Sequence, residues 1–177
     1  NVPPGIGVRP TAGRARKALF DSLGGRLAGA CVFDLCAGSG ALALEAASRG
    51  AAHAVLVESD PRHIRAIEEN IARVERAGVK CAFEVKQAAA ETPGGWIGRA
   101  PAPDVIFADP PYAVSAELFE KLLASAAFRE RAAGALVVWE IPDEPGSIGE
   151  FLRRPPLANQ QIRRFGGTDF LLGEVPA

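Results

Sequence analysis

Short runs of hydrophobic residues alternate along the chain with segments in which hydrophobic positions recur every three or four residues. The runs predict five buried strands, over residues 31–35, 54–58, 80–85, 104–109 and 135–141. The periodic segments predict helices from a Thr11 cap to about Leu23, from Pro61 onward, and over residues 40–49, 116–128 and 147–153. Two further runs flank Gly166 and Gly167 and predict a C-terminal hairpin.

The alternation of strands and helices is typical of an α/β fold in which a mostly parallel sheet is covered on both faces. In such sheets, ligands bind beyond the carboxyl ends of the strands, at the point where the strand order reverses. We expect the first and fourth strands to be neighbours at that reversal. The loops that follow Asp34 and Ala108 should therefore face each other across one crevice.

Length and composition favour one domain with a core of its own. The chain has 177 residues, of which 48% are hydrophobic and 23% are charged. Within a single domain over residues 1–177 we expect a basic N-terminal segment and helix over 1–30 and a Rossmann-like core over 31–177. No uncharged apolar stretch approaches the roughly 18 residues of a membrane span, and the three cysteines lack the paired spacing of a zinc site. These features predict a cytoplasmic monomer with no membrane or metal partner.

Charge is distributed unevenly along the chain. The net charge of −1 argues against a uniformly basic nucleic-acid-binding protein. Residues 1–30 nevertheless hold five basic residues and one acidic residue, and four arginines follow near the other end, Arg153, Arg154, Arg163 and Arg164. A local phosphate-binding face and ordinary solvated helix surfaces would both explain these clusters.

The segment DLCAGSGALALE, residues 34–45, places glycines between a predicted strand and a predicted helix. Gly38 and Gly40 allow a ligand to approach the backbone and bring N–H groups to the positive end of the helix. With Ala43 they match the pattern G-x-G-x-x-G/A. Glu58 follows Gly38 by 20 residues, where a carboxylate can take ribose hydroxyls. The pattern predicts a nucleoside cofactor, which is either a nicotinamide dinucleotide or S-adenosyl-L-methionine.

Asp109, Pro110, Pro111 and Tyr112 end the fourth predicted strand, because proline has no N–H for the sheet. A plain turn would meet that requirement. Opposite a cofactor loop, however, the Asp109 carboxylate and the Pro110 carbonyl can accept the two hydrogens of an exocyclic amino group and aim its lone pair at a methyl carbon. Pro111 stiffens the turn, and Tyr112 offers a flat face to an extruded base. The turn therefore favours methyl transfer to a planar amine over hydride transfer, without a metal.

Four segments, in this order and spacing, resemble the RsmD family of bacterial 16S ribosomal RNA guanine-N2 methyltransferases over residues 7–141: GVRPTAGRARKALFDSL, DLCAGSGALALEAASRGA, VESD and FADPPY. The resemblance implies a three-layer, Rossmann-like class I S-adenosylmethionine-dependent methyltransferase fold with a mostly parallel seven-stranded sheet and the C-terminal antiparallel hairpin. It also implies S-adenosyl-L-methionine as cofactor. The implied partner is 16S rRNA or the assembled small ribosomal subunit, and the implied acceptor is the N2 amino group of a guanine.

The resemblance also implies residue roles. The catalytic residues would be Asp109, Pro110, Pro111 and Tyr112. The cofactor-binding residues would be Asp34, Ala37, Gly38, Ser39, Gly40, Glu58, Ser59, Gln87, Ala88 and Asp109, and the substrate-binding residues Arg9, Thr11, Arg14 and Tyr112. The chain departs from the family pattern at Cys36, where an aromatic is usual, at Gln87-Ala88, where an Asp or Asn often contacts adenine, and in lacking the basic stretch that precedes Arg-Pro-Thr.

Other functions stay open at this point. The same chemistry could act on adenine or cytosine in DNA, or on a protein glutamine amide. A dinucleotide oxidoreductase or a cofactor-binding module without catalysis is a different class. Neither histidine is expected to act as a base: His53 is predicted near a strand start and His63 on the polar face of a helix.

Overall fold

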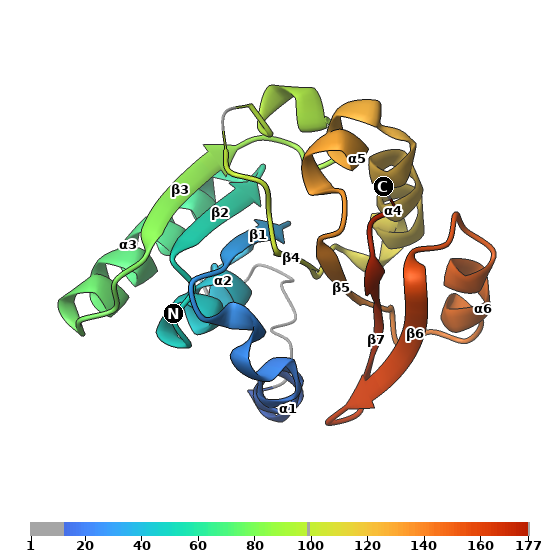
Figure 1. Cartoon of the computed structure of the whole chain (residues 1–177), viewed down its shortest axis with the longest axis horizontal. Coiled ribbons are helices and arrows are strands. Elements are labelled where there is room, and N and C mark those ends of the chain that lie inside the picture. The colour runs from blue at the N-terminus through green and yellow to red at the C-terminus, as the bar shows by residue number, and fades with distance from the viewer. Residues whose placement is uncertain (1–12, 99, 177) are drawn as a thin grey trace.

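A seven-stranded sheet lies at the centre of the computed structural model, which describes residues 13–98 and 100–176 (Figure 1). Five strands are parallel: β1 (Cys31–Leu35), β2 (His53–Glu58), β3 (Ala82–Gln87), β4 (Val105–Ala108) and β5 (Leu136–Glu140). Two more, β6 (Ala158–Phe165) and β7 (Thr168–Glu174), form an antiparallel hairpin whose β7 strand pairs with β5. The strand order is β3-β2-β1-β4-β5-β7-β6. The predicted fold class, including the hairpin, is confirmed.

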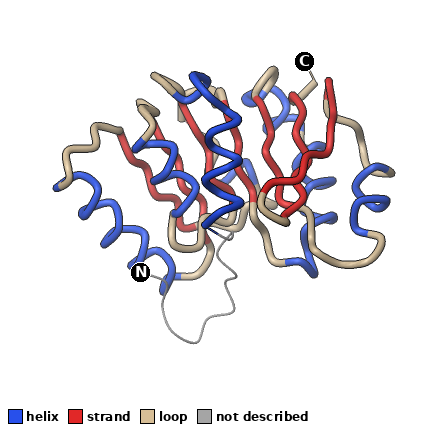
Figure 2. Tube along the Cα trace, turned by 90° about the horizontal axis from the view of Figure 1, so that it is seen from below, coloured by secondary structure: helices blue, strands red, loops and turns tan. Residues whose placement is uncertain are grey.

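Helices cover both faces of the sheet and complete three layers (Figure 2). One face carries α1 (Gly13–Leu23), α2 (Ala41–Ser48) and α3 (Pro61–Arg76). The other carries α4 (Ser115–Ala124), α5 (Ala126–Ala132) and α6 (Ser147–Leu152). Short 3₁₀ turns occur at Gly24–Leu27, Pro93–Gly95 and Tyr112–Val114. None of the helices in the described ranges is long and apolar enough to cross a membrane.

Aromatic side chains fill the layers on both sides of the sheet. On one side the Phe20 ring of α1 stacks on Phe107 of β4, with ring centroids 5.1 Å apart. On the other, Trp139 of β5 meets Phe119 of α4 edge to face at 5.1 Å, and its indole N–H donates to the Ser115 hydroxyl at 3.0 Å. Such aromatic pairs add stabilisation beyond the area that they bury. They hold α1 against β4, which ends at the candidate site, and α4 against β5.

Two elements differ from the predicted ones. The helix predicted over 116–128 is two helices, because Ser125 adopts an extended backbone (φ −72°, ψ 118°) and its hydroxyl accepts the Phe128 N–H at 3.3 Å. The third strand begins and ends two residues later than predicted, since pairing with β2 sets its register and places Gln87 opposite Glu58. The predicted Thr11 cap lies outside the described residues.

Candidate active site

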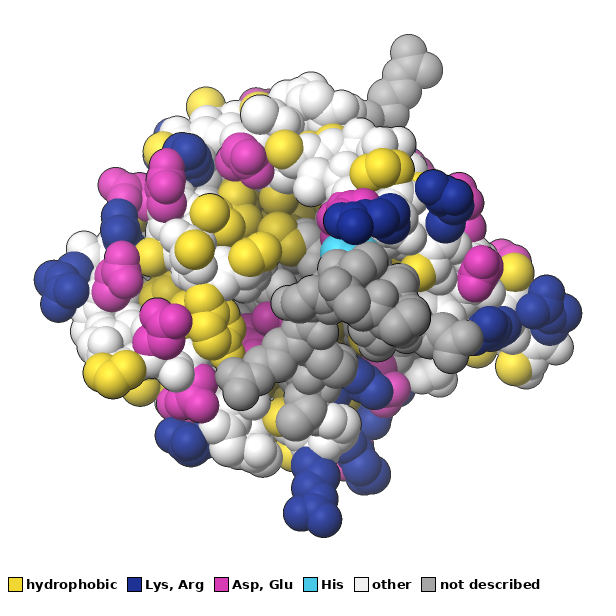
Figure 3. Space-filling view, turned by 180° about the vertical axis from the view of Figure 1, so that it is seen from behind, with side chains coloured by type: hydrophobic (Ala, Val, Ile, Leu, Met, Phe, Trp, Pro, Cys, Tyr) yellow, Lys and Arg dark blue, Asp and Glu magenta, His cyan; other side chains and the backbone are white. Residues whose placement is uncertain are grey.

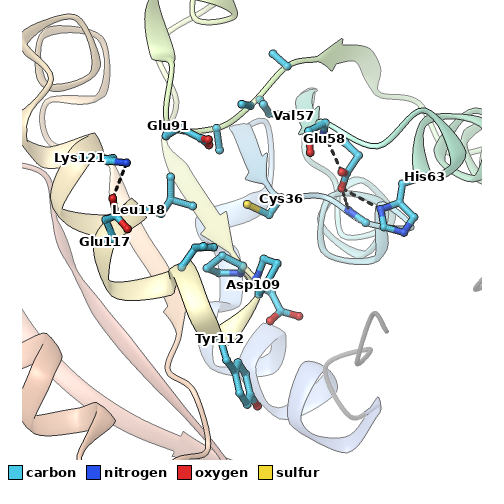
Figure 4. A pocket seen from close by; sticks show the side chains of 18 residues that line it. Cys36, Val57, Glu58, His63, Glu91, Asp109, Tyr112, Glu117, Leu118 and Lys121 are labelled. Atoms are coloured by element: carbon cyan, nitrogen blue, oxygen red, sulfur yellow. Dashed lines mark hydrogen bonds and ion pairs between the residues drawn. The ribbon is translucent and has the colours of Figure 1, made fainter. Parts of the chain in front are cut away.

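The candidate site lies at the carboxyl ends of β1, β2 and β4. β1 pairs with β2 on one side and with β4 on the other, so that Leu35 lies between Val57 and Ala108. Strand order reverses at this point, where ligands bind in open α/β sheets. The loops after β1 and β4 border one pocket of about 600 Å³ (Figure 4). On the rear face the pocket is a hollow lined mainly by hydrophobic side chains (Figure 3). The predicted meeting of these two loops is confirmed.

The loop over residues 36–40 turns sharply from β1 into α2. Cys36, Gly38 and Gly40 all have left-handed backbones, with φ of 62°, 57° and 78°. A Cβ on Gly40 would lie 3.0 Å from Cδ2 of Leu56, so glycine lets the loop pack closely against β2. Glycine occupies such conformations without the steric cost that other residues meet. The two glycines thus serve a tight turn in which Gly38 lines the pocket and Gly40 packs against β2.

Asp34 lies buried beneath this loop and accepts the backbone N–H of Ala43, in the first turn of α2, at 3.0 Å. Burial raises the pKa of Asp34 well above its usual value, and the negative charges of Asp109 and Glu58 act in the same direction, while the bond from Ala43 opposes them. Asp34 is not among the residues that line the pocket. Its contribution is to fix the loop to the start of α2, and a direct cofactor contact stays a prediction.

Glu58 ends β2 and is only 7% exposed. Its Oε1 accepts the N–H groups of Ser59 at 2.8 Å and Asp60 at 2.9 Å. Its Oε2 accepts the N–H of Gly38 at 2.7 Å. The carboxylate therefore ties the end of β2 to the glycine loop while it borders the pocket, as a ribose-binding group would.

His63 also borders the pocket, and its predicted place on a polar helix face is wrong. The residue is 8% exposed, because it lies one turn before the buried Ile67 on the side of α3 that faces the sheet. Its ring is directed at Glu58, with Nδ1 3.5 Å from Oε2 (Figure 4). Sequence reasoning missed His63 as a site residue, although its i, i+4 relation to Ile67 was a usable signal.

Cys36 lines the pocket at the position where an aromatic is usual in the resembling family. Burial raises the pKa of its thiol to about 12, and the negative charges of Glu58 and Asp34 act in the same direction. The thiol is therefore protonated at neutral pH. It contributes an apolar surface to the pocket wall and no reactive thiolate.

The 109–112 turn leaves β4 as predicted, and all four of its residues line the pocket. Pro110 is buried, whereas the Asp109 and Tyr112 side chains are partly exposed. Figure 4 shows Asp109 and Tyr112 on one side of the pocket and Glu58 and His63 on another. The turn thus borders the pocket on a different side from Glu58 and His63.

A further wall comes from α4 and the 3₁₀ turn before it, and sequence reasoning missed it. Val114, Glu117, Leu118 and Lys121 line the pocket, and Lys121 Nζ pairs with Glu117 at 2.7 Å. The segment that follows β3 adds Ala89, Ala90 and Glu91. Spacing of three and four residues directly after the 109–112 turn was the available signal for the helical wall.

The structure brings half of the predicted cofactor set to the pocket. Gly38, Glu58, Ser59, Ala88 and Asp109 line it. Ala37, Ser39 and Gly40 belong to the adjoining loop, where the Ser39 carbonyl accepts from Asn70 at 3.0 Å, and Gln87 is exposed at the end of β3. Arg14 is exposed in the first turn of α1, and Arg9 and Thr11 lie outside the described residues. The individual ligand contacts stay predictions.

Across residues 13–98 and 100–176, no group of three or more His, Cys, Asp or Glu side chains is arranged to hold a metal ion. The expected absence of a metal stays a prediction. Hydrophobic side chains make up most of the pocket wall, and the charged or ionisable ones that join them include Glu58, Glu91, Asp109, Glu117, Lys121 and His63. Such a set suits a nucleoside-sized ligand with hydroxyl groups.

Comparison with known proteins identifies relatives of the chain. YlbH of Bacillus subtilis (strain 168), provisionally named an rRNA methyltransferase, is 34% identical over 113 residues, which cover 61% of this chain and 58% of YlbH. Ribosomal RNA small subunit methyltransferase D of Escherichia coli (strain K12) is 40% identical over 79 residues, which cover 45% of this chain and 40% of that protein. The chain thus matches about half the length of these curated relatives.

A solved structure shares the fold. The RNA methyltransferase of Salinibacter ruber, determined in complex with S-adenosyl-L-homocysteine, superposes with a TM-score of 0.65 over 95% of this chain and 94% of its own, at 18% identity. That likeness concerns the fold alone. A family model described as conserved hypothetical protein 95 matches residues 1–156. The chain therefore belongs to the conserved hypothetical protein 95 family and is an RsmD-like protein, as its four motifs predicted.

Proposed function

We propose that this protein transfers a methyl group from S-adenosyl-L-methionine to the exocyclic N2 amino group of a guanine in the 16S rRNA of the small ribosomal subunit. One observation carries the proposal: the 109–112 turn and the Glu58 carboxylate border the same pocket. Membership of a family that includes an rRNA small subunit methyltransferase supports the RNA substrate. A monomeric, cytoplasmic, one-domain protein over residues 1–177 is part of the same proposal.

The pocket fits S-adenosyl-L-methionine in size and lining. Its volume of about 600 Å³ falls within the range of small-molecule sites. Val57, Ala88 and Leu118 offer apolar surface to an adenine ring, and Glu58 offers acceptors to ribose hydroxyls. The Salinibacter ruber protein of the same fold was solved with the demethylated form of this cofactor. When bound, the cofactor supplies an electrophilic methyl group, and the chain's own residues would place the amine.

The 109–112 turn would hold the target amine. A guanine amino group is a weak nucleophile, because its lone pair is delocalised into the ring. The Asp109 carboxylate and the Pro110 carbonyl would accept its two hydrogens, and this arrangement favours a pyramidal nitrogen whose lone pair points into the pocket. The negative charge of Asp109 would also stabilise the positive charge that develops on nitrogen before a proton is lost to water. Tyr112 would stack on the extruded base.

A basic surface at the same edge of the sheet would hold RNA phosphates. β6 runs parallel to β4, so the end of β6 lies at the same sheet edge as the catalytic turn. There α1 and the β6–β7 turn touch: a Cβ on Gly166 would lie 2.7 Å from the backbone nitrogen of Ala15 (Figure 1). Exposed basic residues here are Arg14 and Lys17 on α1 and Arg163 and Arg164 near the end of β6. Phosphate contacts supply affinity and position without reading sequence.

An acceptor panel tests the proposed function. The protein is incubated with S-adenosyl-L-methionine labelled in its methyl group and with small ribosomal subunits, naked 16S rRNA, DNA or a glutamine-containing protein. We expect label in 16S rRNA, free or assembled. Exclusive labelling of DNA or of protein would show that the chemistry acts on another amine. Tight binding of NAD without binding of S-adenosyl-L-homocysteine would instead indicate an oxidoreductase.

A further inference from the structure

His63 is a buried polar side chain beside the pocket whose two ring nitrogens both lack a hydrogen-bond partner in the described part of the chain. Its contact with Glu58, at 3.5 Å from Nδ1 to Oε2, is too long for a hydrogen bond. Buried polar groups nearly always have a hydrogen-bond partner. A buried group without one has lost its hydrogen bonds to water and gained none in the protein, which costs free energy. An unpaired imidazole at the edge of a ligand pocket therefore points to a partner on the ligand.

The hydrogen bonds that Glu58 already accepts indicate which kind of ligand group could be the partner of His63. A carboxylate has about four lone-pair positions. The N–H groups of Ser59 and Asp60 occupy both positions of Oε1, and that of Gly38 occupies one of Oε2. The remaining position belongs to Oε2, the oxygen that lies nearest His63.

A hydroxyl that donates to this oxygen still has lone pairs of its own to satisfy. A carboxylate cannot satisfy them, because it has no proton to give. The imidazole of His63 can, with a proton on Nδ1. A separation of 3.5 Å between Nδ1 and Oε2 lets one hydroxyl oxygen contact both atoms.

We propose that His63 is a ribose-binding residue: its Nδ1–H donates to a ribose hydroxyl of the cofactor, and the same hydroxyl donates to Oε2 of Glu58. This inference rests on the proposed function, since it requires a nucleoside cofactor. The role of His63 is binding, and no proton moves through it during methyl transfer. Glu58 and His63 together would then select a ligand that keeps its ribose hydroxyls.

The chain contains a second histidine that serves as a matched control. His53 begins β2, and its Nε2 lies 2.9 Å from Oε1 of Glu84 on β3. It is not among the residues that line the pocket. Because the chain has two histidines, their ring signals can be distinguished in a nuclear magnetic resonance spectrum by substituting one of them.

Calorimetric titration with S-adenosyl-L-homocysteine measures the effect of His63. We expect His63→Leu to bind about three- to tenfold more weakly, the loss of one hydrogen bond. His63→Asn should bind within about twofold of the wild type, because the asparagine amide nitrogen can replace Nδ1 as a donor. His53→Leu should leave the affinity unchanged. For the 2′,3′-dideoxy form of the ligand, wild type and His63→Leu should bind equally.

The wild-type protein also gives a direct readout. Addition of S-adenosyl-L-homocysteine should change the ring-nitrogen shifts of His63 and leave those of His53 in place. An equal loss of affinity for both ligands on His63→Leu would assign His63 a structural role and overturn the inference. Unchanged His63 signals on binding would overturn it as well, and they decide alone if His63→Leu fails to fold. If the wild type does not bind this ligand at all, the proposed function fails instead.

Discussion

Glu58→Gln removes one charge from the site with almost no change in shape. A glutamine keeps one side-chain oxygen, which can still accept the Ser59 and Asp60 N–H groups that hold Oε1. In the wild-type protein the Gly38 nitrogen lies 2.7 Å from Oε2 of Glu58. In the variant the glutamine amide nitrogen takes the place of Oε2, so two hydrogen-bond donors face each other. The substitution therefore breaks the tie between β2 and the glycine loop and removes the acceptor intended for ribose.

The structure sets the size of both effects. Losing one charge-assisted hydrogen bond costs about 1.5–3 kcal/mol. For a chain of 177 residues that loss lowers Tm by about 3–12 °C. A bond of the same class to a ribose hydroxyl is lost in the complex, so the Kd for S-adenosyl-L-homocysteine should rise about 10- to 150-fold.

Thermal unfolding and calorimetric titration measure the two effects separately. Glu69→Gln is the matched control, because Glu69 is exposed on α3, away from the pocket lining, and should change neither value. If Glu58→Gln lowers Tm but leaves the Kd within twofold of the wild type, Glu58 only supports the loop. The assignment of a ribose-binding role would then be wrong.

Three further outcomes are expected. Asp109→Asn should reduce the rate of single-turnover methyl transfer by about 10²–10³-fold and the affinity for S-adenosyl-L-homocysteine by less than tenfold. The carboxylate matters most when positive charge develops on the amine nitrogen. Equal losses in rate and in affinity would refute this role. Arg163→Glu should weaken rRNA binding and reduce its salt dependence, measured by filter binding over a salt series. Arg129→Glu, at an exposed position on α5, should change neither quantity. Burial raises the pKa of Cys36 from 9.0 to about 12, so the folded protein holds this proton after the unfolded chain has lost it. The free energy of unfolding should therefore fall as pH rises above about 9, and it should fall less in Cys36→Ser. Denaturant titrations in which both proteins show the same pH dependence would count against this prediction.

The sequence predicted the parts of the fold whose signals are local. Each hydrophobic run became a strand, and the glycines after β1 and the prolines after β4 marked the two loops that border the pocket. Adjacency of β1 and β4 followed from the usual strand order of doubly wound α/β sheets, which reverses after the first strand. The division of residues 116–128 into α4 and α5 was not predicted, because helical periodicity continues across Ser125 while its hydroxyl caps a new helix.

The site was predicted less completely than the fold, since burial depends on contacts between elements distant in sequence. His63 is a polar residue type, and it is buried because it lies on the side of α3 that faces the sheet, where the end of β2 places Glu58 beside it. Gln87 was chosen by its position after the third strand, yet Ala88 to Glu91 are the residues that reach the pocket. β3 ends two residues later than predicted, at Gln87, and this accounts for the difference.

Mass spectrometry of the methylated nucleoside identifies the atom that accepts the methyl group. Small ribosomal subunits from a strain without the corresponding gene are treated with the protein and S-adenosyl-L-methionine carrying a trideuterated methyl group, and the 16S rRNA is digested to nucleosides. We expect one trideuteromethyl group on N2 of guanosine, formed about 10²–10³-fold more slowly when the Asp109→Asn protein is used. Deuterium on a different base, or transfer at full rate by Asp109→Asn, would contradict it.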